Sequence, residues 1–270
     1  MTQAFVRALN YPRLTTLLAA LSAAALLMGA ALAGWWGALL GVLAATLLAG
    51  LAFWNAPHMI LASCRPSPVD DRTAPRLMGI VRAEAKRARL PLPRVYLSHD
   101  AEPNALTAGH GPENAAVAVT TGLCRHLSSA ELAGVVAHEL AHVRHHDSFF
   151  VMVAAVATGA LTGLAALVLL LLAGHLVPLG TVAWIIAALP VAGLAALLQM
   201  ANQRALEFAA DHWAASRHGA AGSLARALRR LEGNTEAEAG SLARRWRELI
   251  SSHPPTRERI RRLGPSSPIS

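Results

Sequence analysis

The chain has 270 residues, of which 54% are hydrophobic and 5% aromatic, and its formal net charge is +8. This composition is too apolar for an ordinary soluble domain, so it argues against a purely soluble enzyme. Nucleic acid is disfavoured as a partner, because the basic residues alternate with acidic ones and no aromatic stacking residues accompany them. The positive charge fits an anionic membrane surface instead.

Two long stretches contain no Asp, Glu, Lys or Arg, from Leu14 to Cys64 and from Ser148 to Gln203. Each stretch is long enough for two membrane-spanning helices of about 20 residues. Turn-forming residues divide each stretch, at Gly34–Gly37 and at Gly174–Pro178. The sequence therefore predicts four spans, which are roughly 14–33, 36–54, 149–173 and 180–200.

All 24 Lys and Arg residues lie outside these spans, in 1–13, 65–147 and 201–270. Positively charged segments next to spans stay on the cytoplasmic side of the membrane. Both termini and the polar segments are therefore predicted to be cytoplasmic. The first apolar stretch, with Ala31-Leu32-Ala33 near its end, also resembles a signal peptide. Cleavage there would leave the topology of the remaining chain unchanged.

These features divide the chain into membrane and cytoplasmic parts. The parts are an N-terminal membrane hairpin (1–64), a first cytoplasmic part (65–147), a second membrane hairpin (148–200) and a second cytoplasmic part (201–270). Cys64 and Cys124 are expected to be free thiols in the reducing cytoplasm, and neither has a spacing typical of a metal site.

The first cytoplasmic part is predicted to begin with an amphipathic helix over Asp70–Leu90, capped by Thr73 and with Pro75 in its first turn. Three short strands are expected after it: Arg94–Leu97, Asn104–Thr107 and Ala115–Thr121. An exposed edge strand of such a small sheet can hold an extended substrate by backbone hydrogen bonds.

A capping box that starts at Ser128 begins a helix predicted to run over residues 129–147. This helix carries a His-Glu-x-x-His motif. Residues four apart lie on one helix face, so His138 and His142 can point at one metal ion. Glu139 can then take the proton of a water bound to that ion. The motif therefore predicts a hydrolytic Zn²⁺ site.

A second acidic motif follows the fourth predicted span. Catalytic zinc needs a third protein ligand and an open position, and Glu207 suits that role. Asp211, one helical turn later, can accept the other ring N–H of a ligating histidine. A helix face that forms ion pairs is the alternative interpretation of these two carboxylates. His142 and Glu207 are both predicted to lie about 10 Å from the apolar layer, given six or seven helical residues between each and its span.

The C-terminal residues 204–264 are predicted to form helical segments. Breaks are expected at Gly219–Gly222, Gly233-Asn234 and His253-Pro254-Pro255. His145 and His146 are expected to be polar surface groups near the membrane. Asp147 is expected to have a structural role at the membrane border.

Together these motifs resemble the M48 family of zinc metallopeptidases, and within it the bacterial HtpX-like membrane proteases. The resemblance covers nearly the whole chain and rests on Pro103–Ala105, Asn114–Gly122, His138–His142, Glu207–Asp211, His253–Thr256 and Arg259-Ile260. It implies a mainly α-helical protein with four transmembrane helices and a cytoplasmic, zincin-like α+β metallopeptidase domain.

The resemblance also implies an endopeptidase activity with one Zn²⁺ per chain and Glu139 as the general base. The implied zinc ligands are His138, His142 and Glu207. Asn104, His253 and Arg259 are implied to approach the substrate, the last two stabilising the oxyanion. A helix stop is the alternative interpretation of His253-Pro254-Pro255.

By the same resemblance, the substrates are damaged or misassembled membrane proteins, cleaved at the cytoplasmic face of the bacterial inner membrane as part of quality control under stress. Two other functions remain open. An intramembrane protease of the site-2 type carries the same motif within a span, whereas Glu131, Arg144 and Asp147 flank it here. A scaffold or regulator with structural zinc is the other alternative, although structural sites usually have four protein ligands and only three suitable ones are found.

Overall fold

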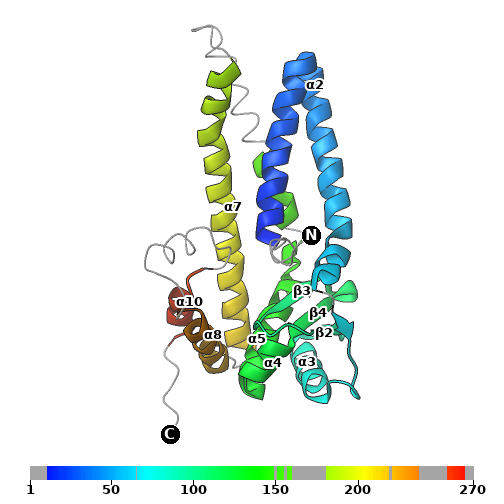
Figure 1. Ribbon diagram of the computed structural model, residues 1–270, viewed down its shortest axis with the longest axis vertical. Coiled ribbons are helices and arrows are strands. Elements are labelled where there is room, and N and C mark those ends of the chain that lie inside the picture. The colour runs from blue at the N-terminus through cyan, green and yellow to red at the C-terminus, as the bar shows by residue number, and fades with distance from the viewer. Residues whose placement is uncertain are drawn as a thin grey trace. The chain divides into compact units, whose positions relative to one another are not determined.

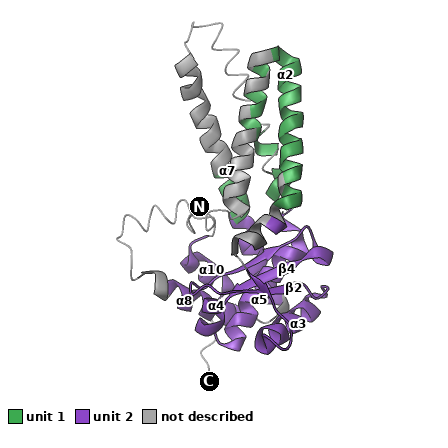
Figure 2. Ribbon diagram, turned by 45° about the vertical axis from the view of Figure 1, so that its right-hand side comes forward, with its two compact units in different colours: residues 1–55, 149–203 green, residues 56–148, 204–270 purple. Residues whose placement is uncertain are grey.

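The computed structural model describes residues 11–64, 66–148, 151–154, 157–159, 181–218, 221–236 and 254–264. It is mainly helical with one small sheet (Figure 1). Contacts between residues divide the chain into two compact units (Figure 2). Unit 1 contains residues 1–55 and 149–203, and unit 2 contains residues 56–148 and 204–270.

Unit 1 contains most of α2, which spans Tyr11–Cys64. Ala33 and Gly34 have non-helical backbone angles, so α2 consists of two helices separated by a kink. Gly34 has a φ of 56°, a left-handed value that glycine adopts without a steric cost. The kink lies where the sequence predicts the first membrane hairpin to turn.

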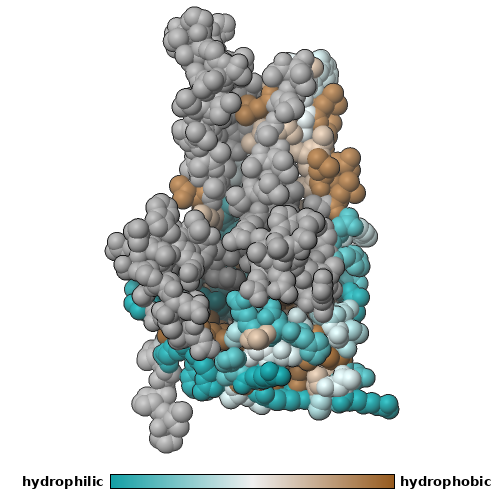
Figure 3. All heavy atoms as spheres, viewed as in Figure 1, coloured by the Kyte–Doolittle hydropathy of each residue, from teal (hydrophilic) through white to brown (hydrophobic). Residues whose placement is uncertain are grey.

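The helix after this kink, Ala33–Asn55, is long and apolar enough to cross a membrane, with a mean hydropathy of 2.0. Within the described ranges it is the one helix with this property, so four spans are not confirmed. Most of the predicted span 149–173 lies outside the described residues. In the space-filling view, hydrophobic side chains gather on the described part of α2, whereas the described surface of unit 2 is mostly hydrophilic (Figure 3).

Unit 2 contains a four-stranded sheet with the order β1-β2-β4-β3. The strands are β1 (Ser67–Pro68), β2 (Arg94–Ser98), β3 (Ala105–Ala108) and β4 (Ala116–Thr120). β2 and β4 are parallel, and the two outer strands are antiparallel to their neighbours. The three predicted strands are thus confirmed, and the short β1 is additional. Among the described strands, β3 is an edge.

Helices α3 (Pro75–Ala88), α4 (Thr121–His126) and α5 (Ser129–His145) belong to the same unit as the sheet. Thr73 does not cap α3, contrary to the prediction. Its backbone N–H and hydroxyl each lie 2.9 Å from Asp70 Oδ1, which closes a turn ahead of the helix. The N-cap position is Ala74, without a side-chain hydrogen bond.

The C-terminal half of the chain contributes α7 (Thr181–His218), α8 (Ala221–Glu236) and α10 (Thr256–Leu263). The predicted break at Gly233-Asn234 is wrong, because α8 continues through both residues. α8 packs closely on α5 at Gly134, where an added Cβ would lie 2.8 Å from the backbone nitrogen of Leu224. A larger residue there would push the two helices apart.

The core of unit 2 lies between the sheet and helices α3, α5 and α8. Its fully buried side chains come from each of these elements, for example Val81, Val117, Val136, Leu140 and Ala227. All five residues of β4 are buried, as expected for a central strand. The core fixes α5 against the sheet, and α5 carries the His-Glu-x-x-His motif.

Candidate metal centre

Helix α5 begins with the predicted capping box. Ser128 Oγ accepts from the Glu131 N–H at 3.3 Å, and Glu131 Oε2 accepts from the Ser128 N–H at 2.8 Å. Two otherwise unpaired N–H groups at the helix start are thereby satisfied. Two turns into the helix, His138 and His142 lie on one face, and their Nε2 atoms are 3.3 Å apart.

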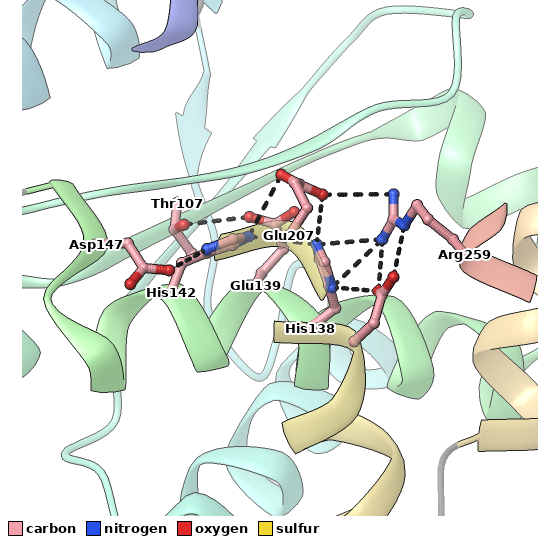
Figure 4. A network of polar contacts seen from close by, with 8 residues as sticks. Thr107, His138, Glu139, His142, Asp147, Glu207 and Arg259 are labelled. Carbon is pink, nitrogen blue, oxygen red and sulfur yellow. Dashed lines mark hydrogen bonds and ion pairs between the residues drawn. The ribbon is translucent and has the colours of Figure 1, made fainter. Parts of the chain in front are cut away.

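Glu207, from α7, meets these two imidazoles (Figure 4). Its carboxylate oxygens lie 3.5 Å from His138 Nε2 and 3.7 Å from His142 Nε2. The three residues form the one group of potential metal ligands in the described part of the chain, with all donor atoms within 4.8 Å of one another. All three belong to unit 2.

The ligand atoms are spaced suitably for zinc. A tetrahedral ion with bonds of about 2.05 Å separates neighbouring ligand atoms by about 3.3 Å. The observed separations of 3.3, 3.5 and 3.7 Å are close to that value. Two imidazole nitrogens and one carboxylate are also a common protein ligand set of catalytic zinc. The residues present therefore fit such an ion.

A carboxylate holds the far nitrogen of each histidine. Asp211 Oδ1 lies 2.9 Å from His138 Nδ1, and Asp147 Oδ2 lies 2.6 Å from His142 Nδ1. A carboxylate that accepts from Nδ1–H in each ring leaves Nε2, on the side of Glu207, as the nitrogen that can bind a metal. The sequence suggests the contact with Asp211 through its spacing from Glu207, but it does not suggest the contact with Asp147.

Backbone geometry at the end of α5 explains the position of Asp147. His146 forms the C-cap with a left-handed φ of 56°, and its N–H bonds to the carbonyls of His142 and Val143. The chain turns back there, which brings the buried carboxylate of Asp147 onto the ring of His142. A lone aspartate five residues after the motif carries no sequence signal for this turn.

Arg259, from α10, closes the His138 side of the cluster. Its Nε and Nη2 atoms donate to the two oxygens of Asp211, both at 2.7 Å. Its Nη1 lies 3.5 Å from Glu207 Oε2. A bidentate pair of this kind fixes both orientation and charge. Arg259 thus connects α10 to the cluster through Asp211 and Glu207, with only 7% of its surface exposed.

The cluster is strongly acidic. Glu139, Asp147, Glu207 and Asp211 contribute four carboxylates against the single guanidinium of Arg259. Burial, and the positive charge of Arg259, would lower the pKa of His138, but contacts with Asp211 and Glu207 outweigh both and raise it to about 9. The pKa of Asp211 is lowered despite its burial, by hydrogen bonds with Arg259 and His138. This environment stabilises added positive charge, as a divalent cation requires.

Glu139 lies beside the two histidines, and its Oε2 accepts a hydrogen bond of 3.1 Å from the Thr107 hydroxyl (Figure 4). Thr107 comes from β3, the edge strand. A small pocket adjoins this contact, lined by residues 107–111 with His142 and His146. Glu139 is therefore contacted by a residue of an edge strand of the sheet.

Of the other predicted site residues, Asn104 is described by the structure and is not part of this cluster. Asn104 is exposed and immediately precedes β3, where its backbone pairs with Thr120. His253 lies outside the described residues. His145 packs edge-on against Trp213 at 6.1 Å between ring centroids. Cys124 is a free, half-buried thiol, and burial raises its pKa.

Comparison with known proteins agrees with this geometry. The family model described as peptidase family M48 matches residues 71–265. A "Protease HtpX homolog" of Burkholderia thailandensis is 37% identical over 277 aligned positions, which cover 94% of this chain and 96% of that protein. A homologue of the same name from Burkholderia mallei has the same identity and coverage.

The crystal structure of S. mikatae Ste24p has a similar fold, with a TM-score of 0.64 at 17% sequence identity. The match covers 88% of this chain and 60% of that chain. At this identity, the similarity concerns the fold.

Proposed function

The chain belongs to peptidase family M48, and on that premise we propose that it is a zinc-dependent endopeptidase of the bacterial inner membrane that cleaves polypeptides at the cytoplasmic face. The observation that carries this proposal is the convergence of His138, His142 and Glu207 beside Glu139. A carboxylate next to a three-ligand cluster suits hydrolysis, whereas a structural site usually has four protein ligands.

His138, His142 and Glu207 would hold the zinc, and their ligand chemistry suits it. When bound, zinc polarises the peptide carbonyl and lowers the pKa of a water molecule. Asp211 and Asp147 fix the ring orientations of the two histidines, and both lie in hydrogen-bond contact with them.

Glu139 acts as the general base and then as the general acid. Its carboxylate takes a proton from the attacking water, whose oxygen bonds to the peptide carbon. Glu139 then delivers that proton to the leaving nitrogen as the C–N bond breaks, which yields a carboxylic acid and an amine. Arg259 contributes positive charge at the side of Glu207, and an oxyanion role for Arg259 and His253 stays a prediction.

The substrate binds in an extended conformation along β3. An edge strand leaves backbone N–H and C=O groups unpaired within its sheet, and a peptide can pair with them as an added strand. β3 contacts Glu139 by the hydrogen bond from the Thr107 hydroxyl. Asn104, exposed at the start of this strand, is placed to contact the same peptide.

The membrane assignment rests on α2, on the charge-free second stretch and on the similarity to the protease HtpX homologues. The exposed fractions of Trp35, Trp36 and Trp54 are 71%, 68% and 70%. Trp36 and Trp54 are 18 helical residues apart, or about 27 Å, which is close to the thickness of the apolar membrane layer. Tryptophan is enriched at both membrane interfaces. We infer four spans, cytoplasmic termini and damaged membrane proteins as the substrates.

The test is metal analysis of the detergent-purified protein, paired with cleavage of casein and of a membrane-protein substrate. We expect about one zinc per chain, and loss of cleavage on chelation that added zinc restores. Cleavage that survives complete removal of metal would contradict the proposal. Zinc bound without any cleavage of either substrate would favour a scaffold or regulator instead.

A further inference from the structure

Thr107 is the side chain that contacts the base. Its hydroxyl donates to Glu139 Oε2 at 3.1 Å across the gap between β3 and α5. In the part of the chain that the structure describes, Glu139 has no second hydrogen-bond partner. A glutamate has several rotatable bonds, so a single well-placed donor restricts its orientation considerably.

The backbone of Thr107 faces a different direction from its side chain. β3 and β4 pair antiparallel, and Thr120 N–H donates to the Asn104 carbonyl at 3.0 Å. Hydrogen-bonded pairs alternate along an antiparallel ladder, so Leu106 and Ala108 bond to β4. The N–H and C=O groups of Ala105 and Thr107 therefore point to the free edge.

Thr107 thus belongs both to the strand that would bind the substrate and to the contacts of the base. Its backbone lies where an extended substrate would pair, and its hydroxyl holds the group that would deprotonate the attacking water. Val117 faces Thr107 across the ladder and is fully buried, which fixes the strand position of Thr107 in the core. Any shift of β3 would move the base as well.

We propose that Thr107 is a positioning residue that fixes Glu139 through its hydroxyl and keeps the base in register with the substrate strand. This inference rests on the proposed endopeptidase function. With Oε2 occupied by Thr107, Oε1 of Glu139 is the oxygen presented to the attacking water. The base is then held in its productive geometry before the substrate binds.

The experiment compares wild type with Thr107→Val, Thr107→Ala and Thr107→Ser. Valine keeps the shape and removes the hydroxyl, alanine removes it without adding bulk, and serine restores it. Thr46→Val is the matched control, because Thr46 is exposed in α2 and its hydroxyl donates to the Val42 carbonyl of its own helix. For each variant, kcat, KM, zinc content and unfolding temperature are measured in the same detergent.

We expect the valine and alanine variants to lose about 10- to 100-fold in kcat, as loss of a hydrogen bond to a charged group predicts, with KM within about twofold. Zinc content and unfolding temperature should match wild type, and Thr107→Ser should recover most of the rate. Thr46→Val should be fully active.

An unchanged kcat in Thr107→Val and Thr107→Ala would overturn the proposal, and so would a serine variant as slow as the valine variant. Loss of zinc or of folding in both hydroxyl-free variants would also overturn it, because Thr107 would then be structural. Failure of the endopeptidase function itself looks different: wild type and Glu139→Gln would then behave alike.

Discussion

Asp147 Oδ2 lies 2.6 Å from His142 Nδ1, which repeats on the second histidine the contact that Asp211 makes with His138. Each imidazole is therefore oriented by its own buried carboxylate, one from the turn that follows α5 and the other from α7. Both carboxylates favour the tautomer that presents Nε2 to a metal. We therefore expect Asp147 to be as important for the orientation of His142 as Asp211 is for that of His138.

Asp147→Ala should weaken zinc affinity by about 10- to 100-fold. A carboxylate that accepts from the far nitrogen of a metal-binding histidine orients that ring and raises its basicity. Competition with a chromophoric chelator measures the affinity. Asp71→Ala, which removes an exposed carboxylate paired with Arg82, serves as the control. Equal affinity in the two variants would show that Asp147 does not support the metal.

Arg259→Gln should destabilise the protein by on the order of 3 kcal/mol, because it leaves the buried Asp211 carboxylate without its bidentate partner. Thermal or denaturant unfolding measures this loss. Arg261→Gln, at an exposed arginine of the same helix, should have a small effect. A loss of catalytic rate in Arg259→Gln with unchanged stability would instead indicate a direct contact with the substrate oxyanion.

Several features of the fold and site were predictable because their signals are local. The capping box at Ser128, the motif spacing and the short strands each depend on residues that are close in sequence. The proximity of Glu207 to the motif followed from its similar distance to the apolar stretch. Such arguments depend on the regular geometry of helices and strands, and the described elements of unit 2 conform to it.

The rest depends on tertiary contacts that no local pattern contains. Asp147 reaches His142 only because His146 adopts a left-handed conformation at the end of α5. Thr107 reaches Glu139 only because β3 is the edge strand next to α5. Thr73 resembles a helix cap, but it bonds to Asp70 because the intervening turn is more compact than expected. Each of these contacts depends on how two elements meet.

Glu131 predicts a pH dependence of stability. Burial would raise its pKa, but hydrogen bonds with Ser128 and the charges of Arg230 and Arg226 lower it below its ordinary value of 4.5. A lowered pKa means that this stabilisation is present above about pH 4.5 and is lost as the pH falls through the folded-state value. Unfolding temperatures of wild type and Glu131→Gln should therefore differ at pH 6 and converge toward pH 3. A difference that grows in acid would contradict this assignment.

The proposed topology predicts the labelling of introduced cysteines. In a variant with Cys64 and Cys124 replaced by alanine, Trp36→Cys should react with a membrane-impermeant thiol reagent added to spheroplasts. Glu113→Cys, exposed in unit 2, should react only after the membrane is permeabilised. The reverse pattern would place the metal cluster on the outer face.

The most direct test of the central claim is the Glu139→Gln variant, which replaces the base with a neutral group of nearly the same shape. We expect wild-type zinc content and wild-type unfolding temperature in this variant, with proteolysis reduced by at least about 100-fold. A Glu139→Gln protein that binds zinc normally and still cleaves casein at the wild-type rate would contradict the central claim.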